Sequence, residues 1–250
     1  MKWDKCNDTL AVIFPEEEGQ KTKRGVLSKL AKVYDPLGFV SPLTLVWKQV
    51  YRDVCDSKTP WDANLNEKLL QRWEKWERSL LPEETVLRSI VSHQEEVTEI
   101  EQHTFGDASI EGVGAAVYAV VRQPSGTSQQ LVTAKSRLAK RSLTISRLEL
   151  VAALMAANLV VNVCNALPKD QIPSIYAWVD SLVVLHWICG QGSYKQFVAN
   201  RVAKICAHPE IQWRYVPTSD NPADIASRGG ESLLQDQSGS RTLKNGQIIQ

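Results

Sequence analysis

The chain has 250 residues, of which 43% are hydrophobic and 23% charged, and its formal net charge at pH 7 is +1. This balance is typical of a globular protein with a sizeable core, and it excludes a disordered polyelectrolyte and a chain that is basic throughout. The five cysteines are widely spaced and form no Cys-x-x-Cys pair, so the sequence predicts neither a disulfide framework nor a zinc site.

Membrane and export signals are not indicated by the sequence. The amino-terminal residues Met-Lys-Trp-Asp-Lys-Cys-Asn-Asp include no apolar run, and the most apolar long stretch, 150–167, is interrupted by three asparagines. We therefore expect no signal peptide, no membrane span and no membrane partner.

The first part of the chain, residues 1–95, is predicted to be a smaller, mostly helical module. A frayed hairpin with a strand at 9–14 is expected first. Three segments with helical spacing of apolar residues follow, at 25–34, 42–55 and 64–81. Asn64 precedes Glu67 by three residues, which predicts a capping box. Trp73 and Trp76 share the apolar face of the third helix, which favours core packing over stacking on nucleic acid.

Residues 85–103 are polar and acidic, which predicts a linker and a domain boundary. The pattern then changes to three strands with tight turns, a long buried helix, and further strands reached through helices. The predicted order βββ-α-β-α-α-β-α covers 100–230, with strands at 103–107, 112–122, 130–135, 175–179 and 211–216. This order predicts an α/β fold with a mixed five-stranded sheet and flanking helices. The last residues, 231–250, are rich in Gln, Ser and Gly and predict a disordered tail.

Four carboxylates lie at the edges of apolar segments in this second part. Asp107 ends the first strand, Glu149 opens the long helix, Asp180 ends the fourth strand, and Asp224 opens the last helix. If the first and fourth strands are neighbours, Asp107 and Asp180 stand side by side, where open α/β sheets place their chemistry. Such a cluster of like charges requires a cation, and an all-oxygen ligand set favours Mg²⁺ or Mn²⁺ over zinc.

Each carboxylate also has a purely structural interpretation. Ser146 precedes Glu149 by three residues, and Asn221 precedes Asp224 by three, so both pairs have the spacing of helix caps. Asp180 could simply begin a helix, and Asp107 could belong to a turn. The four together, in this element order, favour a metal site with two cations that acts on a phosphodiester.

Basic residues gather just ahead of the long helix. No acidic residue occurs between Glu111 and Glu149, whereas several basic residues do. We interpret the central group as a nucleic-acid-binding strip, with a solvated loop face as the alternative. The strip consists of Lys135, Arg137, Lys140 and Arg141.

The motifs around these residues resemble a known family. The segments Thr104-Phe-Gly-Asp107-Ala-Ser, Ser146-Arg-Leu-Glu149-Leu, Trp178-Val-Asp180-Ser and Asn221-Pro-Ala-Asp224-Ile-Ala-Ser-Arg228 are similar to the four acidic motifs of retroelement ribonuclease H domains. Upstream, Tyr34-Asp-Pro-Leu-Gly-Phe-Val-Ser-Pro42 resembles the segment between reverse transcriptase and ribonuclease H in Bel/Pao-type retrotransposons. The resemblance covers about residues 20 to 230.

The resemblance implies a ribonuclease H-like fold and an enzyme that cuts the RNA strand of an RNA/DNA hybrid during reverse transcription. It further implies two Mg²⁺ or Mn²⁺ ions on Asp107, Glu149, Asp180 and Asp224, and a trailing thumb or connection part of the polymerase in residues 1–95. The expected partners are the hybrid and the reverse transcriptase and integrase portions of the same polyprotein. The expected location is the cytoplasm, in a retroelement particle, or the nucleus.

Three alternatives stay open at this point. The chain could be an inactive remnant that serves as a binding or scaffold module. An aspartic peptidase is disfavoured, because its Asp-Thr-Gly or Asp-Ser-Gly triplet is absent from the sequence. Asp220 rivals Asp224 for the fourth carboxylate position, and the loop 215–221 lacks the histidine that many relatives carry there.

Overall fold

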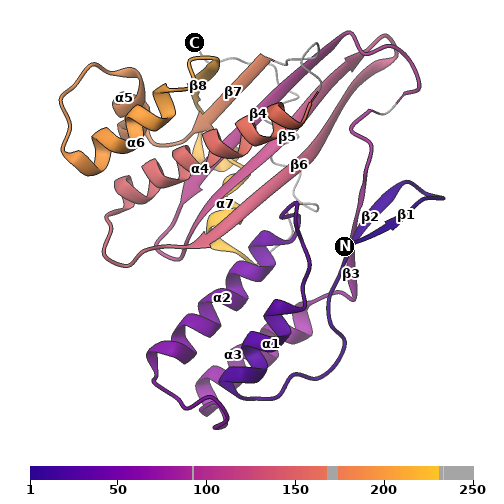
Figure 1. Ribbon diagram of the computed structural model, residues 1–250, viewed down its shortest axis with the longest axis vertical. Helices are drawn as coiled ribbons and strands as arrows, with labels where there is room; N and C mark the ends of the chain where they lie inside the picture. Colours follow the sequence, from indigo (N-terminus) through magenta and orange to yellow (C-terminus); the bar gives the residue numbers. More distant parts are fainter. Residues whose placement is uncertain (92, 168–173, 231–232, 234–250) are drawn as a thin grey trace.

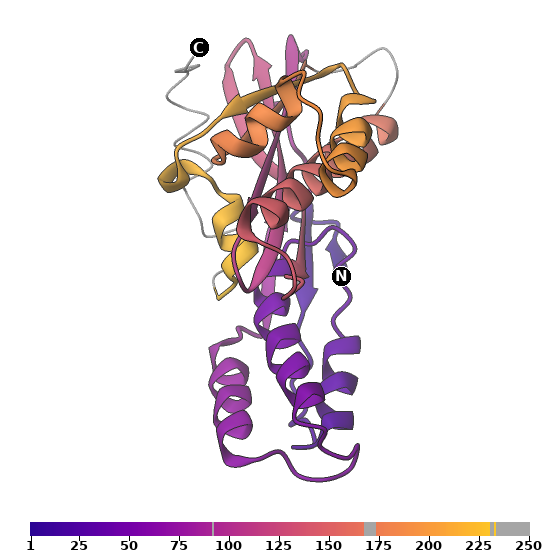
Figure 2. The same ribbon diagram turned by 90° about the vertical axis from the view of Figure 1, so that its left-hand side faces the viewer.

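The computed structural model describes residues 1–91, 93–167, 174–230 and 233. A group of helices and a small sheet come first in the chain, and a larger sheet with its own helices follows (Figure 1). The first group contains β1 Lys2–Asp4, β2 Thr9–Ile13, α1 Lys23–Ala31, α2 Ser41–Asp56, α3 Glu67–Ser79 and β3 Glu83–Leu87. Both views place the three helices, here called the helical module, at one end of the long axis of the molecule (Figures 1 and 2).

Three tryptophans form the core of the helical module. Trp47 on α2 and Trp73 on α3 are fully buried, and Trp76 is almost so. The ring centroids lie 4.2 to 5.5 Å apart in edge-to-face and tilted arrangements, which the quadrupoles of aromatic rings favour. The Trp76 indole nitrogen donates to the carbonyl of Leu43 at 3.1 Å. Core packing, as predicted for Trp73 and Trp76, is therefore confirmed.

Local details of the first part differ from the sequence-based expectations. The side chain of Asn66, not Asn64, caps α3 by accepting a hydrogen bond from the Leu69 amide at 3.0 Å. The predicted linker 85–103 contains most of β3, and β4 already begins at Glu99. β3 pairs antiparallel with β2, and β2 pairs with β1, so the amino-terminal hairpin is part of a three-stranded sheet. The β2–β3 pairing joins residues seventy or more positions apart, which local sequence patterns do not reveal.

The larger sheet has the strand order β6-β5-β4-β7-β8. Its first three strands form an antiparallel meander, and β7 and β8 continue it in parallel. The predicted mixed five-stranded α/β sheet is confirmed. Its elements are β4 Glu99–Ala108, β5 Gly112–Gln123, β6 Gly126–Leu138, α4 Ile145–Ala166, β7 Ser174–Val179, α5 Leu182–Cys189, α6 Gln196–Cys206, β8 Ile211–Tyr215, the 3₁₀ turn η2 Thr218–Asp220, and α7 Ala223–Arg228.

Helices cover both faces of this sheet because side chains alternate along its strands. Val113 and Ala115 of β5 pack against α4, whereas Ala116 faces α7. α4 is the one helix of the described residues that is long and apolar enough to span a membrane by composition alone, and its buried residues pack against the sheet. Of the predicted tail 231–250, only Leu233 is described, and it is buried in the cluster beneath α7; the rest lies outside the described residues.

The helical module is docked on the free edge of the sheet through the segment 35–38. The Leu37 carbonyl accepts hydrogen bonds from the Ala134 amide of β6 at 2.8 Å and from the Thr133 hydroxyl at 2.7 Å. Gly38 has a φ of +74°, and a β-carbon there would overlap the Ala134 carbonyl. A glycine is required because only it combines this backbone conformation with so close an approach. The Asp-Pro-Leu-Gly block therefore connects the two parts of the molecule.

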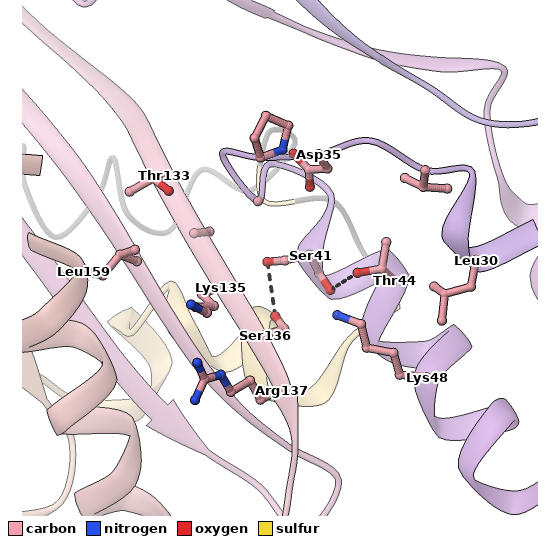
Figure 3. A pocket seen from close by; sticks show the side chains of 14 residues that line it. Leu30, Asp35, Ser41, Thr44, Lys48, Thr133, Lys135, Ser136, Arg137 and Leu159 are labelled. Atoms are coloured by element: carbon pink, nitrogen blue, oxygen red, sulfur yellow. Dashed lines mark hydrogen bonds between the residues drawn. The ribbon is translucent and has the colours of Figure 1, made fainter. Parts of the chain in front are cut away.

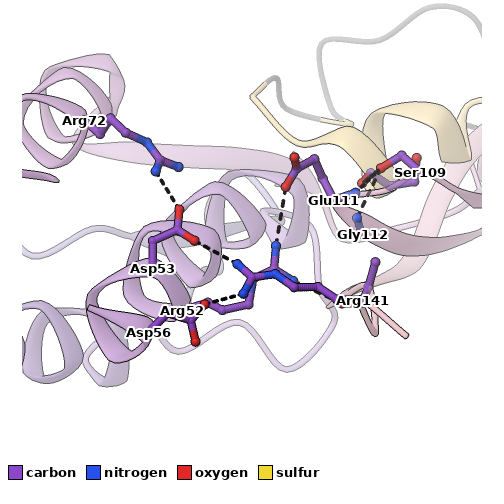
Figure 4. Close-up of polar contacts among 10 residues, drawn as sticks. Arg52, Asp53, Asp56, Arg72, Ser109, Glu111, Gly112 and Arg141 are labelled. Atoms are coloured by element: carbon purple, nitrogen blue, oxygen red, sulfur yellow. Dashed lines mark hydrogen bonds and ion pairs between the residues drawn. The ribbon is translucent and has the colours of Figure 1, made fainter. Parts of the chain in front are cut away.

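Ion pairs extend this contact toward the far end of α2 (Figure 4). Arg141, in the turn after β6, pairs with Asp53 at 3.1 Å and with Asp56, and Asp53 also pairs with Arg72 of α3 at 2.6 Å. Arg52 donates to the Ala139 carbonyl at 3.0 Å. Polar bonds thus follow the whole length of α2 along the sheet edge.

We expect Gly38→Ala to lower the free energy of unfolding by at least about 2 kcal/mol, because the left-handed conformation is costly for alanine and the new methyl group meets backbone. Urea denaturation followed by tryptophan fluorescence measures the effect. Gly230→Ala is the matched control, since Gly230 also has a positive φ of +103° but no atom near its position. Equal effects for the two variants would show that the overlap with Ala134 contributes nothing.

Candidate functional site: a carboxylate cluster at the end of the central strands

The two central strands bring Asp107 and Asp180 together. β4 and β7 are parallel neighbours, and the last paired residues are Gly106 and Val179. The next residues on the two strands are Asp107 and Asp180, so their α-carbons are about one strand spacing apart, roughly 4.8 Å. The prediction that these strands are neighbours in the sheet centre is confirmed.

Two glycines allow the helices that carry the other carboxylates to come close. A β-carbon at Gly106 would lie 3.1 Å from the backbone of Ala152 in α4, and one at Gly114 would meet Ala226 of α7 at 2.6 Å. Glu149 lies one turn before Ala152 in α4, and Asp224 is in the first turn of α7. The close approach of the two helices therefore directs both carboxylates toward the end of β4.

Asp107 is the most buried of the four carboxylates, with 6% of its surface exposed. Burial raises its pKa to about 6, and the negative charges of Asp180 and Asp224 act in the same direction. A hydrogen bond donated by the Ser227 hydroxyl and the charge of Arg228 oppose the rise in this pKa. The group is thus held in a site that disfavours its own negative charge.

The other carboxylates each have one local partner or none. Glu149 accepts a hydrogen bond from the Ser181 hydroxyl at 2.6 Å, and burial is the main cause that raises its pKa, with the charge of Asp180 adding to it. Asp224 pairs with Arg228 four residues later, at 2.6 Å. The side chain of Asp180 makes no hydrogen bond or ion pair with the described residues. Each of the four carboxylates therefore keeps at least one oxygen free of protein partners within the described part of the chain.

These contacts decide between the structural interpretations of the motifs. Ser146 is not a cap, because α4 is preceded by Thr144 and Glu149 bonds to Ser181 instead. Asn221 does support the start of α7: its side chain accepts a hydrogen bond from the Ala223 amide at 3.1 Å and donates to the Gly106 carbonyl at 3.2 Å. Asp224 itself belongs to the cluster, since its charge raises the pKa of Asp107. Asp220 lies in η2, where it accepts a hydrogen bond from Ser219.

Three partners of the carboxylates were not predicted from the sequence: Ser181, Ser227 and Arg228. Ser227 and Arg228 follow Asp224 by three and four residues, the spacing at which helical side chains meet. That spacing could have indicated Ser227 and Arg228 as neighbours of Asp224. Ser181 instead contacts Glu149 across thirty-two positions, and no local pattern indicates such a contact.

The donor chemistry of the cluster fits a hard divalent cation. The ligands would all be oxygens, several are unbonded, and the buried Asp107 would lose its repulsion from Asp180 if a cation lay between them. Among the described residues, however, no three His, Cys, Asp or Glu side chains are gathered closely enough to form a finished metal site. The hydroxyls of Ser181 and Ser227 and the guanidinium of Arg228 hold carboxylate oxygens that a cation would compete for.

The basic residues predicted to form one strip lie in two places. Lys135 and Arg137 are exposed on β6, and Lys140 is exposed in the turn that follows. Arg141 points to the helical module, where Asp53 and Asp56 neutralise its charge. A role of these four residues in binding nucleic acid stays a prediction.

The raised pKa of Asp107 leads to a prediction about stability. Because the folded-state pKa of about 6 exceeds the ordinary value of 3.8, the contribution of Asp107 to stability is fully present below pH 4 and is lost as the pH rises through 6. At pH 7 the buried charge costs roughly 3 kcal/mol. We expect Asp107→Asn to be more stable than the unsubstituted protein at pH 7, by about 1 to 3 kcal/mol, and this gain to shrink toward pH 4.

Chemical denaturation at several pH values, with a chelator present, measures this difference. Glu96→Gln is the control, because Glu96 is exposed and has no ion pair among the described residues. A gain for Asp107→Asn that is the same at pH 4 and pH 7 would contradict the assignment to charge burial.

Comparison with known proteins adds three findings. The family model described as Pao retrotransposon-like RNaseH-like domain matches residues 22–181, a range that includes Asp107, Glu149 and Asp180 and ends before Asp224. None of the curated proteins matches the sequence. Many solved structures match in fold.

Three of these structures show how identity, coverage and TM-score vary among the matches. LC11-RNase H1, solved in complex with an RNA/DNA hybrid, is 18% identical, with 51% of this chain and 93% of that chain covered and a TM-score of 0.36. The amino-terminal RNase H domain of a Mycobacterium tuberculosis protein is 16% identical, with 59% and 99% covered and a TM-score of 0.35. A foamy viral protease-reverse transcriptase, solved with double-stranded DNA, is 10% identical, with 84% and 42% covered and a TM-score of 0.25.

Proposed function

Because this chain belongs to the family of Pao retrotransposon-like RNaseH-like domains, we propose that it is a nuclease that hydrolyses the RNA strand of RNA/DNA hybrids with two divalent cations. The observation that carries the proposal is the carboxylate cluster at the ends of β4 and β7. Asp107 and Asp180 follow paired residues on neighbouring strands there, the charges of Asp180 and Asp224 act on Asp107, and that of Asp180 acts on Glu149. Each of the four carboxylates keeps an unbonded oxygen within the described residues.

Asp107, Glu149, Asp180 and Asp224 would hold the cations. Magnesium or manganese bound there would activate a water molecule and stabilise the leaving oxygen of the phosphodiester. The rise in the pKa of Asp107 supports this role, because a site that repels its own charge in the absence of metal has the most to gain from a cation. We favour Asp224 over Asp220 as the fourth ligand, since the charge of Asp224 raises this pKa.

The neighbouring hydroxyls and Arg228 would position the carboxylates. The Ser227 hydroxyl donates to one oxygen of Asp107, and the Ser181 hydroxyl donates to one oxygen of Glu149. The second oxygen of each carboxylate would then be available to a cation. Arg228 stays beside Asp224, and its pKa is raised chiefly by the hydrogen bond to that carboxylate, with smaller effects from the charges of Asp107 and Asp180. Its positive charge thus lies near the place where a phosphate would bind.

Selectivity for the hybrid would come from contacts to 2′-hydroxyl groups across a shallow minor groove. In a retroelement, such an activity removes the RNA template during reverse transcription, so we propose that the reverse transcriptase and integrase portions of the same polyprotein are its partners. The helical module would be the trailing part of the polymerase.

The proposal is tested with three labelled substrates: an RNA/DNA hybrid, an RNA duplex and single-stranded RNA. We expect cleavage of the RNA strand of the hybrid only, in the presence of Mg²⁺ or Mn²⁺, and none after chelation. Binding of the hybrid without any cleavage, at several Mg²⁺ and Mn²⁺ concentrations, would favour the inactive remnant instead.

A further inference from the structure

A pocket of about 470 Å³ lies between the helical module and the edge of the larger sheet. Its walls are the Asp35–Gly38 segment and α2 on one side and β6 on the other, with Leu159 of α4 at its end (Figure 3). Three cationic side chains line it: Lys48 from α2, and Lys135 and Arg137 from β6. In Figure 3, Lys48 reaches from its helix toward the strand that carries the other two.

None of these three cations forms an ion pair with the described residues. Asp35 is the acidic residue of the pocket, but its two oxygens accept hydrogen bonds from the Phe39 and Val40 amides at 3.0 Å each. Burial lowers the pKa of Lys48; the charge of Asp35 opposes this, and the charges of Arg137 and Lys135 add to it. The pocket therefore has an excess of positive charge, with three cationic side chains against the one carboxylate of Asp35 among its lining residues.

The pocket lies two strands away from the carboxylate cluster. Gly114 of β5 pairs with Ser136 on one side and with Asp107 on the other, so Ser136 is roughly 10 Å from Asp107 between α-carbons. Lys135 and Arg137 flank Ser136, and their side chains lie on the α4 face of the sheet, whereas Asp107 meets Ser227 on the α7 face. A separation of about 10 Å equals about three base-pair steps of 3.4 Å along the axis of a duplex.

We propose that this pocket binds a backbone phosphate of the nucleic acid, a few nucleotides from the bond positioned at the carboxylates. The inference rests on the proposed function and deepens it, because Lys48 makes the helical module part of the substrate site. A backbone phosphate, which has one negative charge, would offset part of the positive charge contributed by both parts of the molecule. The short distance between this pocket and the end of β4 favours a phosphate of the substrate backbone over a free phosphate.

The test measures binding, not cleavage. The full chain carrying Asp180→Asn is titrated against a fluorescent RNA/DNA hybrid and a DNA duplex at several salt concentrations. We expect Lys48→Gln, and separately Arg137→Gln, to weaken binding of both duplexes about fivefold near 0.1 M salt and to reduce the salt slope by up to about 0.9. The double variant should lose less than the sum of the single losses, because both residues contact one phosphate.

Lys75→Gln is the matched control, since Lys75 is exposed on α3 and has no ion pair among the described residues. Affinities and salt slopes of Lys48→Gln and Arg137→Gln equal to those of Lys75→Gln would overturn the proposal. The proposal would also be overturned if inorganic phosphate bound the pocket, detected by the NMR signals of Lys48, and Lys48→Gln left duplex binding unchanged. Duplex binding that depends on Lys48 in a protein without hydrolytic activity would instead uphold the pocket and reject the hydrolase.

Discussion

Asp180→Asn is expected to reduce cleavage of the RNA strand in a hybrid by about 10³-fold or more, equivalent to about 4 kcal/mol of lost transition-state stabilisation. Asp180 is beside Asp107 at the end of the parallel strands and has no protein partner for either oxygen among the described residues. The amide keeps the shape of the side chain but removes the charge that would hold a cation. Single-turnover cleavage with Mg²⁺ measures the loss.

Asp220→Asn is the matched control for this experiment. It removes the same charge from a residue four positions before Asp224, and we expect cleavage to be largely retained. Thermal denaturation of both variants establishes that they are folded. Full activity of Asp180→Asn would point to a contaminating nuclease, and loss of activity in Asp220→Asn but not in Asp224→Asn would exchange the two residues in the proposed site.

Trp73→Ala is expected to lower the free energy of unfolding by about 3 to 5 kcal/mol, the second large effect. Trp73 is fully buried and contacts both other tryptophans, with ring centroids 5.3 Å from Trp47 and 5.5 Å from Trp76. Its removal leaves a cavity between α2 and α3, which the surrounding side chains fill only in part. Urea denaturation, followed by far-ultraviolet circular dichroism, measures this change in stability.

Trp73→Phe separates packing from polarity. Among the described residues, the indole N–H of Trp73 has no acceptor, so a phenyl ring removes a buried unsatisfied donor and keeps most of the apolar contact. We expect a loss of less than about half of that caused by alanine. A phenylalanine variant as unstable as the alanine variant would show that the indole shape, not the buried area, determines stability here.

The element order of the larger sheet could be predicted because each element has its own local period. Alternation along 112–122, the long apolar helix and the short apolar strands are all visible in the sequence, and the helical connections predict that the later strands join the meander in parallel. In this sheet β7 pairs with β4, and that pairing places Asp180 beside Asp107. The closeness of Glu149 and Asp224 depends further on Gly106 and Gly114, whose role is apparent only from the helices packed on them.

Contacts between distant segments account for what the sequence did not reveal. Residues 85–87 of β3 were predicted to be linker because the stretch 85–103 is polar and acidic, and only pairing with β2 makes them part of a strand. Arg141 was assigned to a binding strip because its neighbours are basic, whereas its actual partners, Asp53 and Asp56, are more than eighty residues away. Asn64 was predicted to cap α3 because it precedes Glu67 by three residues, whereas the helix begins at Glu67 and Asn66 caps it.

The docking of Leu37 on β6 also protects the protein from self-association. A β-strand at the rim of a sheet offers unpaired amides and carbonyls to any other strand, which makes it a template for aggregation. In this molecule the Leu37 carbonyl accepts a hydrogen bond from the Ala134 amide of the edge strand β6, and α2 lies along the same edge. A fragment that begins near residue 100 would expose that rim, so the helical module shields the edge of the larger sheet as well as bordering the pocket.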